Sequence, residues 1–160
     1  MSKFNLKERT LVIIKPDAFQ RGLLGEILSR FEHKGLKIVG LKMVHLSDVL
    51  LDEHYDVHKN KPFFNELKRF MKTSPCVVLC LEGLEAVSVV RLICGPTASR
   101  TAPPGTIRGD FSMSGQATVV HASDSIENAK REINLFFAAS ELFEYSKCES
   151  EFIYGEGERE

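Results

Sequence analysis

His121 is the residue whose type and setting most clearly suggest chemistry. It ends a short β-branched run, and a helix is predicted to begin three residues later, at Asp124. The start of a helix offers free N–H groups and a positive dipole end, which favour bound anions. Neutral imidazole has a lone pair near pH 7 and can accept a phosphoryl group and pass it on. A hydrogen-bonded core histidine is the plainer interpretation. Exposed or partly exposed positions are predicted for the other four histidines, which have polar neighbours: His33, His45, His54 and His58.

Three cations occur in settings that favour a phosphate site. Lys15 follows four consecutive apolar residues, Arg91 is the only cation of an apolar helical segment, and Arg108 lies in a glycine-containing loop. A buried ammonium needs an anion, and a planar guanidinium matches phosphate oxygens with two hydrogen bonds. Plainer alternatives also exist. Lys15 could pair with Asp17, and Arg91 could stabilise a helix C-terminus. Arg108 could form a salt bridge with Asp110 inside its loop.

A histidine that faces phosphate-binding cations predicts nucleophilic phosphoryl transfer. The cations, assisted by Mg²⁺, would stabilise the charge that spreads over the transferring oxygens. The sequence contains neither a G-x-x-x-x-G-K-[ST] loop nor a G-x-G-x-x-G turn after a strand. The predicted site is therefore neither a P-loop nor a Rossmann site.

Apolar periodicity predicts the elements that must position these residues. Strands are predicted where short apolar runs stop at turn residues, over 10–15, 36–46, 76–81 and 118–121. Helices are predicted where apolar residues recur at helical spacing, over 24–31, 47–58, 62–71, 84–94 and 124–137, with a short turn over 140–145. Ser47 and Asp124 are the predicted N-caps, and Gly35 stops the first helix. Ile126 is placed on the inner face of the last helix.

Two further segments have unusual composition. The helical segment 84–94 is apolar nearly all round, which predicts deep burial. The segment 95–117 is rich in glycine and proline and predicts one long structureless loop, which is usually functional at such a length.

The predicted order of elements is β-α-β-(α-α)-β-α-loop-β-α. Two β-α-β units joined by a helical hairpin predict an α+β fold of the ferredoxin-like, split β-α-β kind. This is a four-stranded antiparallel sheet with helices on one face, plus an inserted helical hairpin and a long loop. A doubly wound parallel sheet is the alternative, and it needs more strands than this chain offers. We predict one domain over 1–160, with a core over about 8–154 and a solvated acidic tail over 155–160.

The composition is typical of a globular domain and argues against several functional classes. The 160 residues include 21 basic and 22 acidic side chains, and the net charge of −1 argues against a surface that is basic throughout and binds nucleic acid. The longest apolar run, 76–81, is much shorter than the roughly 20 residues of a membrane span. The N-terminal residues show no hydrophobic signal region, so a cytoplasmic protein is expected. The four cysteines lack a C-x-x-C pair and are predicted to be reduced packing residues.

Longer motifs resemble those of nucleoside diphosphate kinases over nearly the whole chain, from about Glu8 to Tyr154. The N-terminal motifs are Glu8-Arg9-Thr10, Ile14-Lys15-Pro16-Asp17, Gln20-Arg21-Gly22-Leu23 and Gly25-Glu26-Ile27. The middle motifs are His54-Tyr55 and Lys61-Pro62-Phe63-Phe64. The most specific motifs are Pro104-Gly105-Thr106-Ile107-Arg108-Gly109-Asp110-Phe111 and His121-Ala122-Ser123-Asp124-Ser125. Their combination in this order identifies the resemblance.

The resemblance implies ping-pong transfer of the γ-phosphoryl group from a nucleoside triphosphate to a nucleoside diphosphate. His121 would be the nucleophile that carries the group as phosphohistidine, and Ser123 and Glu132 would support it. Mg²⁺ would arrive with ATP or another triphosphate, on the phosphates and without a ligand from the protein. Family members share the ferredoxin-like fold and form homo-hexamers or tetramers, so self-association is expected, with a hexamer as the first expectation.

The resemblance also implies which residues bind the nucleotide. Phosphate contacts are implied for Lys15, Arg91 and Arg108, with Thr97 and Tyr55 beside them. The base would pack against Phe63 and its aliphatic neighbour Leu67, although a pair at this spacing is also common in an ordinary core.

Thr118 departs from the family pattern, because the family usually has asparagine three residues before the histidine. The preceding segment, 114–117, also differs from the usual amino-acid sequence of the family at this place. These departures keep open an alternative, a catalytically weakened member that acts as a nucleotide- or partner-binding protein. Nucleic acid is not expected as the main partner, since no feature beyond the same cations supports it.

Overall fold

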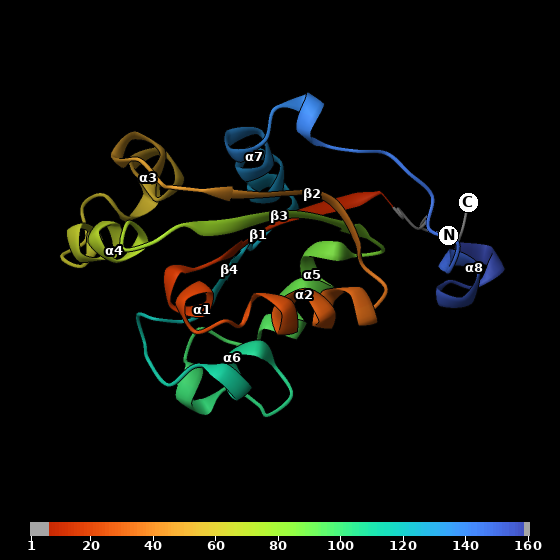
Figure 1. The fold of residues 1–160 in the computed structure, drawn as a ribbon, viewed down its shortest axis with the longest axis horizontal. Helices are drawn as coiled ribbons and strands as arrows, with labels where there is room; N and C mark the ends of the chain where they lie inside the picture. Colours follow the sequence, from red (N-terminus) through yellow and green to blue (C-terminus); the bar gives the residue numbers. More distant parts are fainter. Residues whose placement is uncertain (1–6, 159–160) are drawn as a thin grey trace.

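The sheet at the centre of the molecule has four strands in the order β2-β3-β1-β4, and every neighbouring pair is antiparallel (Figure 1). The computed structural model describes residues 7–158. Its strands are β1 (Glu8–Ile14), β2 (Lys37–Val44), β3 (Cys76–Gly83) and β4 (Val120–Ala122). A helical crossover leads into each outer strand, which is the ferredoxin-like arrangement and confirms the predicted fold. The antiparallel pairing excludes the doubly wound alternative.

Strand β1 lies inside the sheet, and both of its faces are apolar. Leu11, Val12, Ile13 and Ile14 have 0% exposed surface, although successive side chains of a strand point to opposite faces. The hydrophobic core accordingly has two parts. Val12 and Ile14 pack in one part, and Leu11 and Ile13 pack in the other. Both faces of the sheet therefore need a cover.

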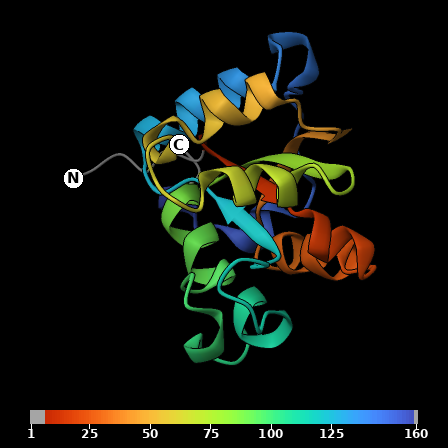
Figure 2. The same ribbon diagram turned by 90° about the vertical axis from the view of Figure 1, so that its left-hand side faces the viewer.

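Helices cover both faces, so the predicted one-sided cover is wrong. One face carries α1 (Pro16–Gln20), α2 (Leu24–His33), α5 (Ala86–Cys94) and α6 (Ile107–Phe111). The other face carries α3 (Asp48–His54), α4 (Phe64–Met71) and α7 (Ile126–Phe136). Figures 1 and 2 show α3 and α7 on one side of the sheet, with α2 and α5 on the other. The two crossover helices share one face as predicted, and the inserted hairpin and the last long helix close the other.

The remaining elements are short. They are the 3-10 turns η1 (Asp56–His58), η2 (Ser99–Thr101), η3 (Ala139–Glu141) and η4 (Glu156–Glu158), and the helix α8 (Ser150–Ile153). Within residues 7–158, no helix is both long enough and apolar enough to cross a membrane. Residues 1–6, which belong to the segment examined for a signal region, and 159–160, the end of the predicted acidic tail, lie outside the described residues.

Three helices are present where the sequence predicts none: α1, α6 and the four-residue α8. Pro16 ends β1 and also begins α1, because the missing N–H of proline costs nothing at the first position of a helix. The segment 95–117 contains η2 and α6 and is not the single structureless loop predicted. In α6, the Thr106 side chain accepts a hydrogen bond from the Gly109 N–H and caps the helix.

Three details of the predicted helices are wrong, and one is confirmed. The side chain of Ser47 caps α3 as predicted, but Ser125, not Asp124, caps α7 through the Asn128 N–H. Ile126 then faces outward, with 51% of its surface exposed. On α5, Leu92 is 72% exposed, so this helix is not buried on every side.

The four cysteines are free thiols within the described part of the chain. Cys76, Cys80 and Cys94 are buried, whereas Cys148 is exposed. Burial raises the pKa of each buried thiol to about 12, which keeps it protonated and inert near neutral pH. The prediction of reduced packing residues is therefore confirmed for three of the four.

Candidate active site

A cavity of about 1500 Å³ collects nearly all of the residues that the sequence singled out. It lies between the hairpin of α3 and α4, the start of α7 and the segment that leads into β4. The predicted site residues that line it are Lys15, Tyr55, Phe63, Leu67, Arg91, Thr97, Arg108, Thr118, His121 and Glu132. Ser123 is the exception, because it is 1% exposed and lies behind Glu132.

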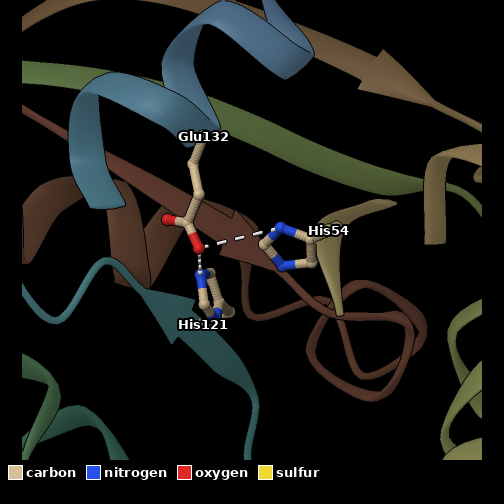
Figure 3. A group of neighbouring side chains, drawn as sticks. All are labelled: His54, His121 and Glu132. Atoms are coloured by element: carbon tan, nitrogen blue, oxygen red, sulfur yellow. Dashed lines mark hydrogen bonds and ion pairs between the residues drawn. The ribbon is translucent and has the colours of Figure 1, made fainter. Parts of the chain in front are cut away.

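His121 is held in place by a carboxylate. It sits in the middle of β4, opposite Ile13 of β1, and its Nε2 lies 3.1 Å from Glu132 Oε1 (Figure 3). Burial disfavours the charged form of Glu132, but hydrogen bonds from His121 and Ser123 outweigh it and hold the pKa of this carboxyl below its ordinary value. An ionised carboxylate only accepts hydrogen bonds, so Nε2 carries the proton. The lone pair of the neutral ring is then on Nδ1.

Ser123 fixes the far side of the same carboxylate. Its hydroxyl donates to Glu132 Oε2 and accepts from the Leu11 N–H of β1 at 3.3 Å. Glu132 is thereby tied to the sheet as well as to α7. The chain Leu11, Ser123, Glu132 and His121 is a continuous set of hydrogen bonds that sets the orientation of the imidazole.

His54 lies against His121, and the prediction that it is exposed is wrong. Its surface is 3% exposed and its ring centroid is 4.7 Å from that of His121. Burial, with a smaller contribution from His121, lowers the pKa of His54 to about 3, so the ring is neutral. The helical spacing held a signal for this, because His54 follows the buried Leu51 by three residues and shares its face of α3.

Lys15 is a buried ammonium at the wall of the cavity. Its Nζ donates to the Gln116 carbonyl and to Thr118 Oγ1, each at 3.1 Å, and not to Asp17. Burial lowers the pKa of Lys15 to about 8, against opposition from the nearby Asp17 charge. Asp17 instead accepts a hydrogen bond from the Val119 N–H at 3.0 Å. The ammonium is therefore short of compensating charge, which an anionic ligand would supply.

Arg108 braces the loop and still keeps donors for a ligand. Its guanidinium donates to three backbone carbonyls, those of Gly95, Thr118 and Val120. A guanidinium has five N–H groups, so two remain for other partners. The alternative pairing with Asp110 is wrong, because Asp110 pairs with Arg30 at 2.7 Å.

The loop around Arg108 requires a close approach of the backbone. An ideal Cβ on Gly109 would lie 2.0 Å from the Pro103 carbonyl oxygen, so only glycine fits there. Arg91 and Thr97, both exposed, complete this side of the cavity.

Val119 has a backbone conformation that β-branched residues rarely adopt. Its φ is 58°, in the left-handed region. Two hydrogen bonds hold it there, from its own N–H to Asp17 and from the Lys15 N–H to its carbonyl. The strain, about 1–2 kcal/mol, lies two residues before His121 and was not signalled by the residue type.

The mouth of the cavity is aromatic. Phe63 is 44% exposed, in keeping with a binding surface and not with an ordinary core position. Leu67 and Phe70 lie on the same helix wall, and Lys15 Nζ is 5.2 Å from the centre of the Phe70 ring. Tyr55 is buried, and burial raises the pKa of its phenol above the usual range, so its O–H stays protonated.

Comparison with known proteins identifies the family. The family model described as nucleoside diphosphate kinase matches residues 8–142. The chain belongs to the nucleoside diphosphate kinase family. The nucleoside diphosphate kinase of Pyrococcus horikoshii is 54% identical over 153 residues, which cover 94% of this chain and 97% of that protein. That of Staphylothermus marinus is 56% identical over 138 residues, covering 86% and 98%.

Solved structures of the family have the same fold. The halophilic nucleoside diphosphate kinase of Halobacterium salinarum, in complex with CDP, superposes with a TM-score of 0.91 at 41% identity, covering 93% of this chain and 99% of that one. The enzyme of Aquifex aeolicus superposes with a TM-score of 0.82 at 44% identity, covering 85% and 99%. The resemblance found in the motifs is therefore confirmed, and the chain is a member of a family of nucleotide-binding phosphotransferases.

Proposed function

We propose that this chain transfers the γ-phosphoryl group of a nucleoside triphosphate to a nucleoside diphosphate, with His121 carrying the group between the two half-reactions. The observation that carries the proposal is the setting of His121. Glu132 accepts a hydrogen bond from the Nε2 N–H, so the lone pair is on Nδ1, in the wall of a cavity that also contains Lys15, Arg91 and Arg108.

Each half-reaction is a single displacement. The Nδ1 lone pair forms a bond to the γ-phosphorus, and the bond to the bridging oxygen breaks, leaving its electron pair on the departing diphosphate. The second diphosphate then attacks the phosphohistidine and restores the imidazole. Glu132 stabilises the positive charge that the ring gains in the first step, while the three cations stabilise the phosphate oxygens.

The nucleotide is proposed to enter with its base at the mouth of the cavity. Phe63 offers an exposed ring face for stacking, and Leu67 extends the apolar wall. Stacking on a face suits every base, so the proposal includes broad tolerance of bases. Tyr55 and Thr97, which line the same cavity, are proposed to lie beside the phosphates.

Mg²⁺ is proposed to be held by nucleotide phosphate oxygens. Mg²⁺ prefers oxygen ligands, whereas the metal-ligating group found among residues 7–158 is rich in imidazole: His54, His121 and Glu132. This group is a poor ligand set for Mg²⁺, which agrees with an ion that arrives bound to the nucleotide. When bound there, Mg²⁺ neutralises charge on the phosphates and so assists the Lys15 and Arg108 side chains.

Self-association remains part of the proposal, with a homo-hexamer first and a tetramer as the alternative. Strand β2 is an outer strand of the sheet, and Leu41 and Met43 on it are 50% and 58% exposed. Exposed apolar side chains on an outer strand, which has one free edge, favour cover by another chain. Light scattering gives the molar mass in multiples of 18.0 kDa. The cytoplasmic location also stays a prediction.

The phosphohistidine is the direct test. Incubation with ATP labelled on the γ-phosphate should leave an acid-labile phosphate on the protein, and addition of GDP should remove it as GTP. His121→Ala should abolish both steps while the protein stays folded by circular dichroism. His33→Ala, an exposed histidine on α2, is the matched control and should label normally. Normal labelling of His121→Ala would refute the assignment.

Thr118 is the position at which a weakened enzyme would be detected. Its Oγ1 is buried and accepts from Lys15 Nζ, so it braces the ammonium in place of the longer asparagine amide. Thr118→Asn should raise kcat/KM for nucleoside diphosphates by about threefold to tenfold, the value of one hydrogen bond to the nucleotide. An unchanged or lower kcat/KM would mean that threonine already meets the requirement.

A further inference from the structure

The side chains of His54, His121 and Glu132 form a compact group of possible metal ligands in the wall of the cavity. His121 Nε2 lies 3.1 Å and His54 Nδ1 lies 3.7 Å from the same atom, Glu132 Oε1. Their ligating atoms all lie within 4.8 Å of one another. Figure 3 shows both rings directed at the one carboxylate, from β4 and α3, with Glu132 reaching in from α7.

The geometry of this group is close to that of a metal site. Zinc bonds of roughly 2.0–2.1 Å to nitrogen and oxygen in a tetrahedron separate the ligand atoms by about 3.3 Å. The two separations from Glu132 Oε1, 3.1 and 3.7 Å, lie on either side of that value. The two imidazole nitrogens lie within 4.8 Å of each other, so a bound ion would draw the His54 ring toward His121. Two imidazoles and one carboxylate are also a common ligand set of zinc, and nitrogen ligands favour Zn²⁺ over Mg²⁺.

His54 provides an independent observation. Only 3% of its surface is exposed, and neither of its ring nitrogens has a hydrogen-bond partner. Buried polar groups are nearly always paired, and an unpaired one costs about 1–3 kcal/mol. Its Nδ1 is nevertheless within 3.7 Å of the Glu132 carboxylate. A cation between them would satisfy this nitrogen.

Access to the site is open on one side. The His121 side chain is 24% exposed, and all three residues line the cavity. A metal bound by three protein ligands would have its fourth position toward this space, where water completes the tetrahedron. Glu132 supplies one negative charge to the site. Among the described residues, the arginine or lysine nearest to this carboxylate is Arg131, whose Nη2 lies 4.0 Å from Glu132 Oε1.

We propose that Zn²⁺ binds to His54 Nδ1, His121 Nε2 and Glu132 Oε1, and that this binding inhibits phosphoryl transfer. Inhibition follows from the bonding at His121. Zinc bonds to Nε2 only in the tautomer whose proton is on Nδ1, so the proton that Nε2 donates to Glu132 in the metal-free protein moves to Nδ1 when zinc binds. The nitrogen proposed to attack phosphorus then has no lone pair. The site is thus an inhibitory metal site in which one of the ligands, His121, is also the nucleophile.

The inhibition rests on the proposed role of His121, whereas the metal site does not. Zinc binding is therefore measured first, on nucleotide-free protein, by competition with a chromophoric zinc chelator. Every protein carries Cys148→Ser, which removes the exposed thiol as a second ligand. The expected result is one Zn²⁺ per chain. His54→Phe, which keeps the packed volume, should weaken binding at least about tenfold, while His33→Ala leaves it unchanged.

A spectroscopic measurement does not depend on the folding of a variant. Co²⁺ bound to the unsubstituted site should give the intense visible absorption of a four-coordinate ion, and Zn²⁺ should displace it. Absence of this absorption, or binding that His54→Phe and His121→Ala leave intact, overturns the proposed site.

The effect on catalysis is measured separately. At a buffered free Zn²⁺ concentration and with Mg²⁺-ATP in excess, the rate of His121 labelling should fall in proportion to zinc occupancy. His54→Phe should shift the inhibition curve by the same factor as the binding curve. Labelling that is insensitive to a fully bound site overturns the inhibition. A protein that binds zinc and is never labelled by ATP would refute the proposed function and leave the metal site standing.

Discussion

Replacing Lys15 by methionine should change how the stability of the protein depends on pH. Burial lowers the pKa of Lys15 from an ordinary 10.5 to about 8. The unfolded chain therefore holds this proton to a higher pH than the folded protein does. Stability contributed through Lys15 rises with pH between about 8 and 10.5, and below pH 8 the folded protein carries the full cost of a buried charge.

The size of the effect follows from the two pKa values. At about 1.4 kcal/mol for each pH unit, the difference between 10.5 and about 8 corresponds to roughly 3 kcal/mol. Between pH 7 and pH 10, wild type should gain about 2–3 kcal/mol relative to Lys15→Met, which has no proton to lose at this position. Differences in packing or hydrogen bonding between the two side chains do not vary with pH and cancel from this comparison.

The assay is urea unfolding of both proteins at pH 7, 8, 9 and 10, at one protein concentration so that self-association contributes equally. Lys130→Met, which removes an exposed lysine of α7, is the control and should run parallel to wild type. A stability difference between Lys15→Met and wild type that stays constant across this range would refute the conclusion that Lys15 is a buried, uncompensated cation.

Three further substitutions test other parts of the structure. Glu132→Gln should lower kcat by about 10- to 100-fold in a coupled ATP-to-GDP assay, with little change in the KM for the nucleotide. The reason is that Glu132 holds the nucleophile and not the nucleotide. An equal change in KM would contradict this. Glu85→Asn should raise the free energy of unfolding, measured by urea titration, by roughly 0.5–1 kcal/mol. Glu85 has a φ of 49°, a backbone conformation that asparagine tolerates better than glutamate. A lower free energy of unfolding would count against backbone strain at Glu85. Gly109→Ala should destabilise the protein by about 3 kcal/mol or more in urea titration, because its Cβ would lie 2.0 Å from a carbonyl oxygen. Gly115→Ala, whose Cβ would have nothing within 4 Å, is the matched control and should be near neutral; equal effects of the two substitutions would contradict the steric argument.

The order of strands and the identity of the site residues could be predicted because they are recorded in local patterns. The run before Lys15 is apolar at every position, and the motif around Arg108 is specific. The one-sided cover was wrong for a reason visible in the same run. A strand that is apolar at successive positions, from Leu11 to Ile14, has two faces to bury, and only a strand that alternates can leave one face to water.

The features that sequence reasoning missed depend on contacts between distant segments. His54 has polar neighbours along the chain, but its packing partners His121 and Phe136 come from β4 and α7. The left-handed backbone of Val119 is imposed by Asp17, about a hundred residues earlier. Short helices such as α1 are too brief to show a period of 3.6 residues.

The position of His121 at the margin of the sheet has a dynamic consequence. Strand β4 has three residues, and its one neighbour in the sheet is β1. A short outer strand opens at a lower free energy than a central one such as β3, so its amide hydrogens should exchange with solvent first. A nucleotide that bridges β4 to the opposite wall would slow this exchange and leave β3 unchanged. Amide protection in β4 therefore reports ligand occupancy at the residue that reacts.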